Sequence, residues 1–218
     1  MKIALVYTGA GILSNISSIA SDIFPQCEIM NILDDSLIKD CIKAGYMTNE
    51  VKLRLINIFQ YAYYSGAGLV LLTCSSVGES AELGNALVPI PILRIDQPMC
   101  EEAVSSANAI GVIGTLPTTL LPTSELIKKI MTKEGKTIPV ETKLAEGAYE
   151  AGIAGNFALH DKLIEEAASE LTTSKKCDVI VLAQASMARM EKQLTDITNK
   201  KVLSSPVSGI SQLKAFIK

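Results

Sequence analysis

The chain has 218 residues, 48% of them hydrophobic and 20% charged, so it can bury a large core and does not read as a disordered protein. Its net charge of −3, with a pI near 5.3, offers no basic surface to nucleic acid or to an acidic membrane. The amino terminus shows no signal peptide, and no apolar stretch is long enough to span a bilayer. We therefore expect a cytoplasmic protein without a nucleic-acid or membrane partner.

The predicted elements alternate between strand and helix along almost the whole chain. In the first half we expect strands over 2–7, 28–33, 90–95 and from Leu69 to Cys74, with helices over 11–21, 36–44, 49–64 and 77–87. In the second half we expect helices over 99–108, 123–132, 156–171, 186–195 and 207–217. Its strands are predicted over 110–114, 136–140, 178–183 and 201–203, with a Thr/Pro-rich loop through Pro122.

This alternation predicts an α/β fold with doubly wound parallel sheets. The strand-to-helix segment after Asp178 repeats the form of the segment around Cys74, and the strand at Ile110 echoes the one at Ile3. The sequence thus predicts two pseudo-symmetric lobes with an active-site cleft between them. We place the first lobe at residues 1–97 plus 206–218, and the second at 98–205.

Five scattered cysteines, without a CxxC pair, predict reduced thiols rather than a disulfide framework: Cys27, Cys41, Cys74, Cys100 and Cys177. The single histidine, His160, cannot by itself form a typical zinc site or a Ser–His–Asp triad, and we expect it at the surface or at an interface. The Gly9-x-Gly11 turn lacks the third glycine of a dinucleotide-binding loop. We therefore expect no metal and no nicotinamide.

Cys74 follows a buried strand and precedes a predicted helix, within the segment Leu72-Thr73-Cys74-Ser75-Ser76. Ligands of open α/β sheets bind at the carboxyl ends of strands, and a helix N-terminus lowers the pKa of a nearby thiol. The alternative is a buried cysteine that serves as a small hydrophobic residue.

Four segments together resemble the aspartate/glutamate racemase superfamily, which includes hydantoin racemases, maleate isomerases and arylmalonate decarboxylases. Three of them are the loop that starts at Tyr7-Thr8-Gly9, the segment that contains Cys74, and the strand and loop Gly111–Thr119. The fourth, Leu182-Ala183-Gln184-Ala185-Ser186, lies where the family has its second catalytic cysteine. The resemblance spans nearly the whole chain in order and spacing.

The resemblance implies a cofactor-independent enzyme that acts at the carbon alpha to a carboxylate of a small amino acid or related acid, with Cys74 as the catalytic residue. It implies a ring of hydroxyls and backbone amides for that carboxylate, formed by Thr8, Gly9, Ser75, Ser76, Thr115, Thr118, Thr119, Gln184, Ala185 and Ser186. The hydroxyl residues alternatively only cap helices. By analogy with the family, a homodimer is possible.

This sequence departs from the family pattern at two positions. Gln184 replaces the second cysteine, and Tyr7 stands where glutamate racemases have an acidic residue. A neutral amide has no acid–base chemistry near neutral pH, so one thiol remains for proton transfer. Gln184 then either donates a hydrogen bond to substrate or is a structural amide. Several functions stay open for this chain. It is a divergent isomerase-like enzyme, a single-cysteine decarboxylase or isomerase, or an enzyme whose Cys74 forms a covalent adduct with its substrate. The alternative is a protein that binds small carboxylates without turnover.

Overall fold

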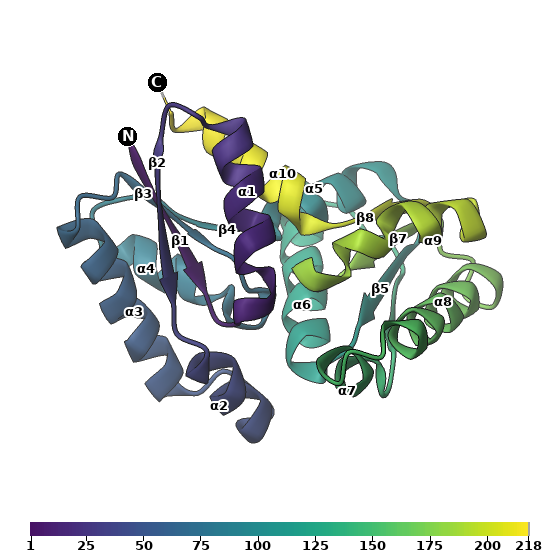
Figure 1. The fold of residues 1–218 in the computed structure, drawn as a ribbon. Coiled ribbons are helices and arrows are strands. Elements are labelled where there is room, and N and C mark those ends of the chain that lie inside the picture. Colours follow the sequence, from purple (N-terminus) through teal and green to yellow (C-terminus); the bar gives the residue numbers. More distant parts are fainter. Residues whose placement is uncertain (218) are drawn as a thin grey trace. The chain divides into compact units, whose positions relative to one another are not determined.

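The computed structural model describes residues 1–217 and forms two compact units. The first comprises Met1–Gln97 and the chain from Pro206 on, and the second comprises Pro98–Ser205. Each unit contains one four-stranded sheet in which all strands are parallel, covered by helices (Figure 1). The predicted α/β class with parallel sheets is confirmed.

The first sheet has the order β2-β1-β3-β4. Its strands are β1 (Lys2–Tyr7), β2 (Glu28–Leu33), β3 (Leu69–Leu72) and β4 (Ile92–Arg94). Strands β1 and β3 are central and read as aliphatic runs because helices cover both of their faces. Ala4 and Val6 point into a core shared with α2 and α3, whereas Tyr7 points to the opposite face, toward β2 and α1.

The helices of this unit are α1 (Leu13–Ile23), α2 (Ser36–Ala44), α3 (Asn49–Tyr64) and α4 (Ser80–Leu87). The carboxyl-terminal segment adds α10 (Ser205–Ser211) and the 3₁₀ helix η4 (Gln212–Ala215). In Figure 1, α3 lies on one side of the sheet and α1 with α10 on the other. The helix predicted over 207–217 is thus divided into two shorter pieces.

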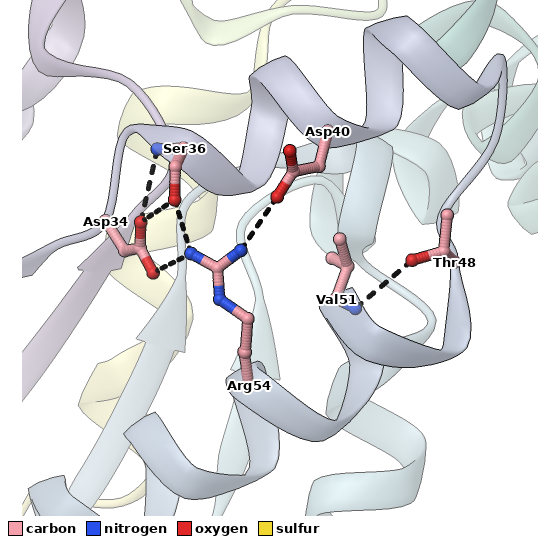
Figure 2. A network of polar contacts seen from close by, with 6 residues as sticks. All are labelled: Asp34, Ser36, Asp40, Thr48, Val51 and Arg54. Atoms are coloured by element: carbon pink, nitrogen blue, oxygen red, sulfur yellow. Dashed lines mark hydrogen bonds and ion pairs between the residues drawn. The ribbon is translucent and has the colours of Figure 1, made fainter.

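A polar network joins α2 to α3 (Figure 2). Arg54 of α3 donates to the carboxylates of Asp40 (2.8 Å) and Asp34 (2.5 Å), and Asp34 also accepts from the Ser36 hydroxyl (2.6 Å). Thr48 caps α3 by accepting from the Val51 N–H (3.3 Å), as its position before the helix suggests. The network fixes α2, which carries the buried Cys41 into the core.

The second sheet has the equivalent order β6-β5-β7-β8. Its strands are β5 (Ile110–Gly114), β6 (Val140–Leu144), β7 (Val179–Leu182) and β8 (Lys201–Leu203). The helices are α5 (Gln97–Ser106), α6 (Pro117–Glu134), α7 (Ala148–Ile153), α8 (Phe157–Thr173) and α9 (Glu191–Thr198). Two apolar clusters, one on each face of this sheet, form the core.

Two predicted elements of the second unit are wrong, and one helix was missed. The expected loop through Pro122 is the beginning of α6, because Pro117 occupies the first helical position and Pro122 removes only one helical hydrogen bond. The strand expected over 136–140 is found at Val140–Leu144, and α7 was not predicted. Within residues 1–217, no helix is long and apolar enough to cross a membrane.

Candidate functional site

Cys74 lies at the carboxyl edge of the first sheet, two residues beyond β3. The preceding residue, Thr73, fixes the end of β3 to β1, because its N–H (3.0 Å) and hydroxyl (2.9 Å) both donate to the Val6 carbonyl. Cys74 itself is extended (φ −126°, ψ 119°) and precedes a short 3₁₀ helix, η2 (Ser75–Val77). The chain therefore reverses immediately after the cysteine and turns backbone N–H groups toward it.

The sulfur of Cys74 accepts several hydrogen bonds. They come from the Thr8 hydroxyl, from the N–H and hydroxyl of Ser76, and from the Val77 N–H, which also donates to the Cys74 carbonyl (3.4 Å). Burial nevertheless raises the pKa of the Cys74 thiol above its usual value, and these hydrogen bonds offset only part of that rise. The resting state is the neutral thiol. The N–H groups at the start of η2 lower the pKa of Cys74, as expected at a helix N-terminus, but burial outweighs them. Helix α4 begins only at Ser80, so its dipole does not start at the sulfur.

The remaining predicted residues of this edge surround the cysteine turn. Thr8, Ser75 and Ser76 are all buried, and Gly9 has open space where a side chain would project. Tyr7, at the position of the family's acidic residue, is fully buried and donates to Asn31 Oδ1 (3.0 Å). Burial raises the pKa of Tyr7 far above its usual value, so it remains neutral and supplies no base.

Gln184 occupies the corresponding place in the second unit, two residues beyond β7. Its Oε1 accepts from the Thr115 N–H (2.7 Å) and from the Thr115 hydroxyl (2.9 Å). A backbone N–H can only donate, so this contact fixes which end of the amide is the oxygen. Nε2 must point away from Thr115, and no hydrogen bond joins it to another described residue. Gln184 is thus held as a hydrogen-bond donor.

The two edges are built alike. Cys74 and Gln184 both precede a 3₁₀ helix with nearly the same backbone angles, at φ −126°, ψ 119° and φ −127°, ψ 134°. Thr8 follows β1 as Thr115 follows β5, and each threonine hydroxyl donates to the residue two positions beyond the third strand of its unit, Cys74 Sγ or Gln184 Oε1. Gln184 is therefore the structural counterpart of Cys74 within the same chain.

The amino terminus of α6 carries the other polar groups of the second edge. Its N-cap, Leu116, has no side chain that could cap the helix. Thr118 is 7% exposed, and its hydroxyl has no partner among the described residues. Because Pro122 has no N–H, the Thr118 carbonyl also lacks its helical donor. The start of α6 is therefore a helix N-terminus without a side-chain cap that carries a buried hydroxyl without a partner among the described residues.

The other predicted groups of this edge differ in exposure: Thr119 and Ala185 are buried, whereas Ser186 is exposed. The structure thus brings each half of the predicted set to the carboxyl edge of its own sheet. In the part of the chain that is described, no cluster of three or more histidine, cysteine or acidic side chains could hold a metal ion.

Sequence reasoning missed the surroundings of His160, which is buried rather than at the surface. Its Nδ1 lies 2.8 Å from Asp161 Oδ1 and 3.0 Å from Arg189 Nη2, and Arg189 also packs 5.1 Å from the centre of the Phe157 ring. Arg189 belongs to η3 (Ala185–Met190), the turn that follows Gln184. No sequence motif joins these residues, because 28 positions separate Arg189 from Asp161.

Two equivalent parallel sheets, each followed after its third strand by a polar turn, define a duplicated α/β protein. The family model for Asp/Glu/hydantoin racemase matches residues 6–213. The chain therefore belongs to the Asp/Glu/hydantoin racemase family, as its motifs suggested.

Solved structures agree in fold. The glutamate racemase isoform RacE1 from Bacillus anthracis is 16% identical with a TM-score of 0.79, covering 98% of this chain and 80% of that one. The allantoin racemase from Klebsiella pneumoniae is 14% identical with a TM-score of 0.70, covering 99% and 87%. Unliganded arylmalonate decarboxylase is 12% identical with a TM-score of 0.60, covering 98% and 91%. No curated protein sequence gives a significant match.

Proposed function

We propose that the protein catalyses cofactor-independent proton transfer at the carbon alpha to a carboxylate of a small amino acid or related acid. In this proposal Cys74 is the only acid–base group. The observation that supports it best is the pairing of roles: a thiol surrounded by hydrogen-bond donors in one unit, and an amide fixed as a donor at the equivalent place in the other. The family membership and the racemase activities named for the structural neighbours agree with such chemistry.

Cys74 can act in both directions of a proton transfer. As the neutral thiol it can donate its proton to a carbanion, and as the thiolate it can take a proton from the α-carbon. The hydrogen bonds from Thr8, Ser76 and Val77 stabilise the thiolate when it forms. Its raised pKa makes the thiolate the scarcer form, so proton removal becomes faster as the pH rises.

The second edge stabilises negative charge in this proposal. Gln184 Nε2, the Thr118 hydroxyl and the N-terminus of α6 would donate to the substrate carboxylate and to the enediolate that develops when the α-proton leaves. Gln184 cannot return a proton from the opposite face, since an amide is not an acid at neutral pH. The expected outcome is exchange of the α-proton on one face.

Proton exchange in heavy water tests this function. The purified protein is incubated with D- and L-aspartate, D- and L-glutamate and hydantoins, and loss of the α-proton signal is followed by NMR. We expect exchange for at least one compound, loss of exchange in Cys74→Ala, and normal exchange in Cys27→Ala, a control thiol of the same unit.

Exchange that survives in Cys74→Ala would exclude Cys74 as the acid–base group. Thermal stabilisation by these compounds without any exchange would instead identify a carboxylate-binding protein that has no turnover.

A further inference from the structure

A buried ion pair lies beside the Cys74 turn. Arg94, the last residue of β4, donates from Nε to Asp96 Oδ1 (2.9 Å) and from Nη2 to Asp96 Oδ2 (2.8 Å). Arg94 is 7% exposed and Asp96 0%. Removing two charges from water costs more free energy than their attraction in the interior usually recovers. Stability alone therefore seldom explains a buried ion pair.

The guanidinium of Arg94 packs face-on against Gly78, the residue that ends the η2 turn. A Cβ at residue 78 would lie 2.6 Å from each of the Cζ, Nε and Nη2 atoms of Arg94. The backbone of Gly78 (φ −56°, ψ −34°) is ordinary helical geometry that any residue adopts, so the conformation does not require glycine there. The close contact with the Arg94 guanidinium, however, leaves no room for a side chain at residue 78, and so requires glycine there.

Gly78 also stabilises the η2 turn, whose N–H groups donate to the sulfur of Cys74. Its N–H donates to the Ser75 carbonyl (3.1 Å), which closes the turn that includes Ser76 and Val77. Those two residues supply the backbone N–H groups that point at Cys74 Sγ. A displacement of Gly78 would therefore move both donors.

The carboxyl-terminal segment supports Arg94 from the other side. Gln212 Nε2 donates to the Arg94 carbonyl (2.8 Å), and Gly209 of α10 is so close to β4 that a Cβ there would lie 2.2 Å from the Ile95 oxygen. The end of β4 is thus enclosed by α10 on one side and by the Cys74 turn on the other.

We infer that Arg94, oriented by Asp96, is a positioning residue that holds the η2 turn in place and so keeps the Ser76 and Val77 N–H groups on Cys74 Sγ. Its relevance to catalysis rests on the proposed function, but its direct consequence is a property of the thiol. The pair sets how readily Cys74 ionises, whether or not a substrate is present.

Alkylation of Cys74 by iodoacetamide as a function of pH tests this inference. Cys27 is replaced by Ser because it is partly exposed, and the modified residue is identified by peptide mass spectrometry. The midpoint of the rate profile reports the ionisation of Cys74, and it is insensitive to a change in access that only scales the rate. Arg94→Lys and Asp96→Asn are compared with the parent, and Arg54→Lys serves as a matched control in the same unit.

We expect both Arg94→Lys and Asp96→Asn to move the midpoint upward by about one pH unit, which is a tenfold change in thiol ionisation and corresponds to the loss of one hydrogen bond to the thiolate. Arg54→Lys should leave it unchanged. The two variants separate positioning from simple charge. Lysine keeps the positive charge but not the planar two-point contact, and Asp96→Asn leaves the arginine charge uncompensated, which would by itself move the midpoint downward.

An unchanged or lowered midpoint in either variant, with folding verified by circular dichroism, would overturn the inference. Should one variant fail to fold, the other decides. A raised midpoint in a protein that shows no proton exchange would support the positioning role while contradicting the proposed function, so the two failures are distinguishable.

Discussion

Two substitutions of Gln184 distinguish its structural role, as acceptor for Thr115, from its proposed role as a donor to the ligand. Replacing it by leucine removes the acceptor of both the Thr115 N–H and the Thr115 hydroxyl. Thr115 is only 6% exposed, so water cannot easily replace that acceptor. A buried donor left without a partner costs about 1–3 kcal/mol, and the hydroxyl can turn to limit its share. We therefore expect Gln184→Leu to lower the free energy of unfolding by about 2–4 kcal/mol.

Gln184→Glu keeps both acceptor contacts, so its stability should remain within about 1 kcal/mol of the parent. It replaces the outward donor Nε2 by a carboxylate oxygen, which repels an anionic ligand. Urea unfolding gives the stability, and the thermal shift produced by aspartate or glutamate gives binding. We expect Leu to lose both stability and binding, and Glu to lose binding alone. A Gln184→Leu variant as stable as the parent, or a Gln184→Glu variant that still binds the ligand, would refute the reasoning.

Three further predictions follow from the structure. Thr118→Val removes a buried hydroxyl without a partner, so it should raise the free energy of unfolding by about 1 kcal/mol while weakening the thermal shift by carboxylates; an unchanged shift would exclude Thr118 from the site. Gly84→Ala places a Cβ 2.5 Å from Ile92 Cδ1, so urea unfolding should show a loss of about 1–3 kcal/mol; full stability would mean that the core relaxes around it. Because burial raises the pKa of Cys74, its thiolate fraction grows with pH, and proton exchange should still be increasing at pH 9, above the ordinary thiol pKa of about 8.5; a plateau below pH 8 would indicate another base.

The fold could be predicted largely because the central strands carry strong signals. The aliphatic run of β3 is buried on both faces, and helices α2 and α3 begin and end where the sequence predicts them, with Thr48 and Gly45 at their limits. Gly45 has a positive φ of 82°, which explains why a glycine ends α2.

The second sheet was harder to predict because its errors lie where local signals compete. Strand β6 is at the sheet edge and only half buried, so Val140–Leu144 shows little apolar pattern, while Thr137 and Ile138 before it are β-branched residues typical of strands. The polar first turn of α6 resembles a loop because Thr118 and its neighbours do not cap the helix in the usual way. A helix that begins without a side-chain cap does not show the sequence signature of a helix start.

The candidate site was predictable only where it coincides with strand ends. Cys74 and Gln184 could be found because each lies two residues after an aliphatic strand. Arg94 could not, because its contact with Gly78 joins residues 16 positions apart through packing alone, and the orientation of the Gln184 amide depends on Thr115, 69 positions away. Contacts of this kind depend on the sheet bringing distant loops together.

Stereochemistry tests the central claim, that one thiol acts without a second base. A single enantiomer of an exchanging substrate is incubated in heavy water, and its deuterium content and configuration are measured together, with Gln184→Cys as the variant designed to restore a second thiol. The account predicts that deuterium enters with retention of configuration in the parent and that the opposite enantiomer appears only in Gln184→Cys. Formation of the opposite enantiomer by the parent at the rate of exchange would show that a second proton-transfer group exists and would contradict the account.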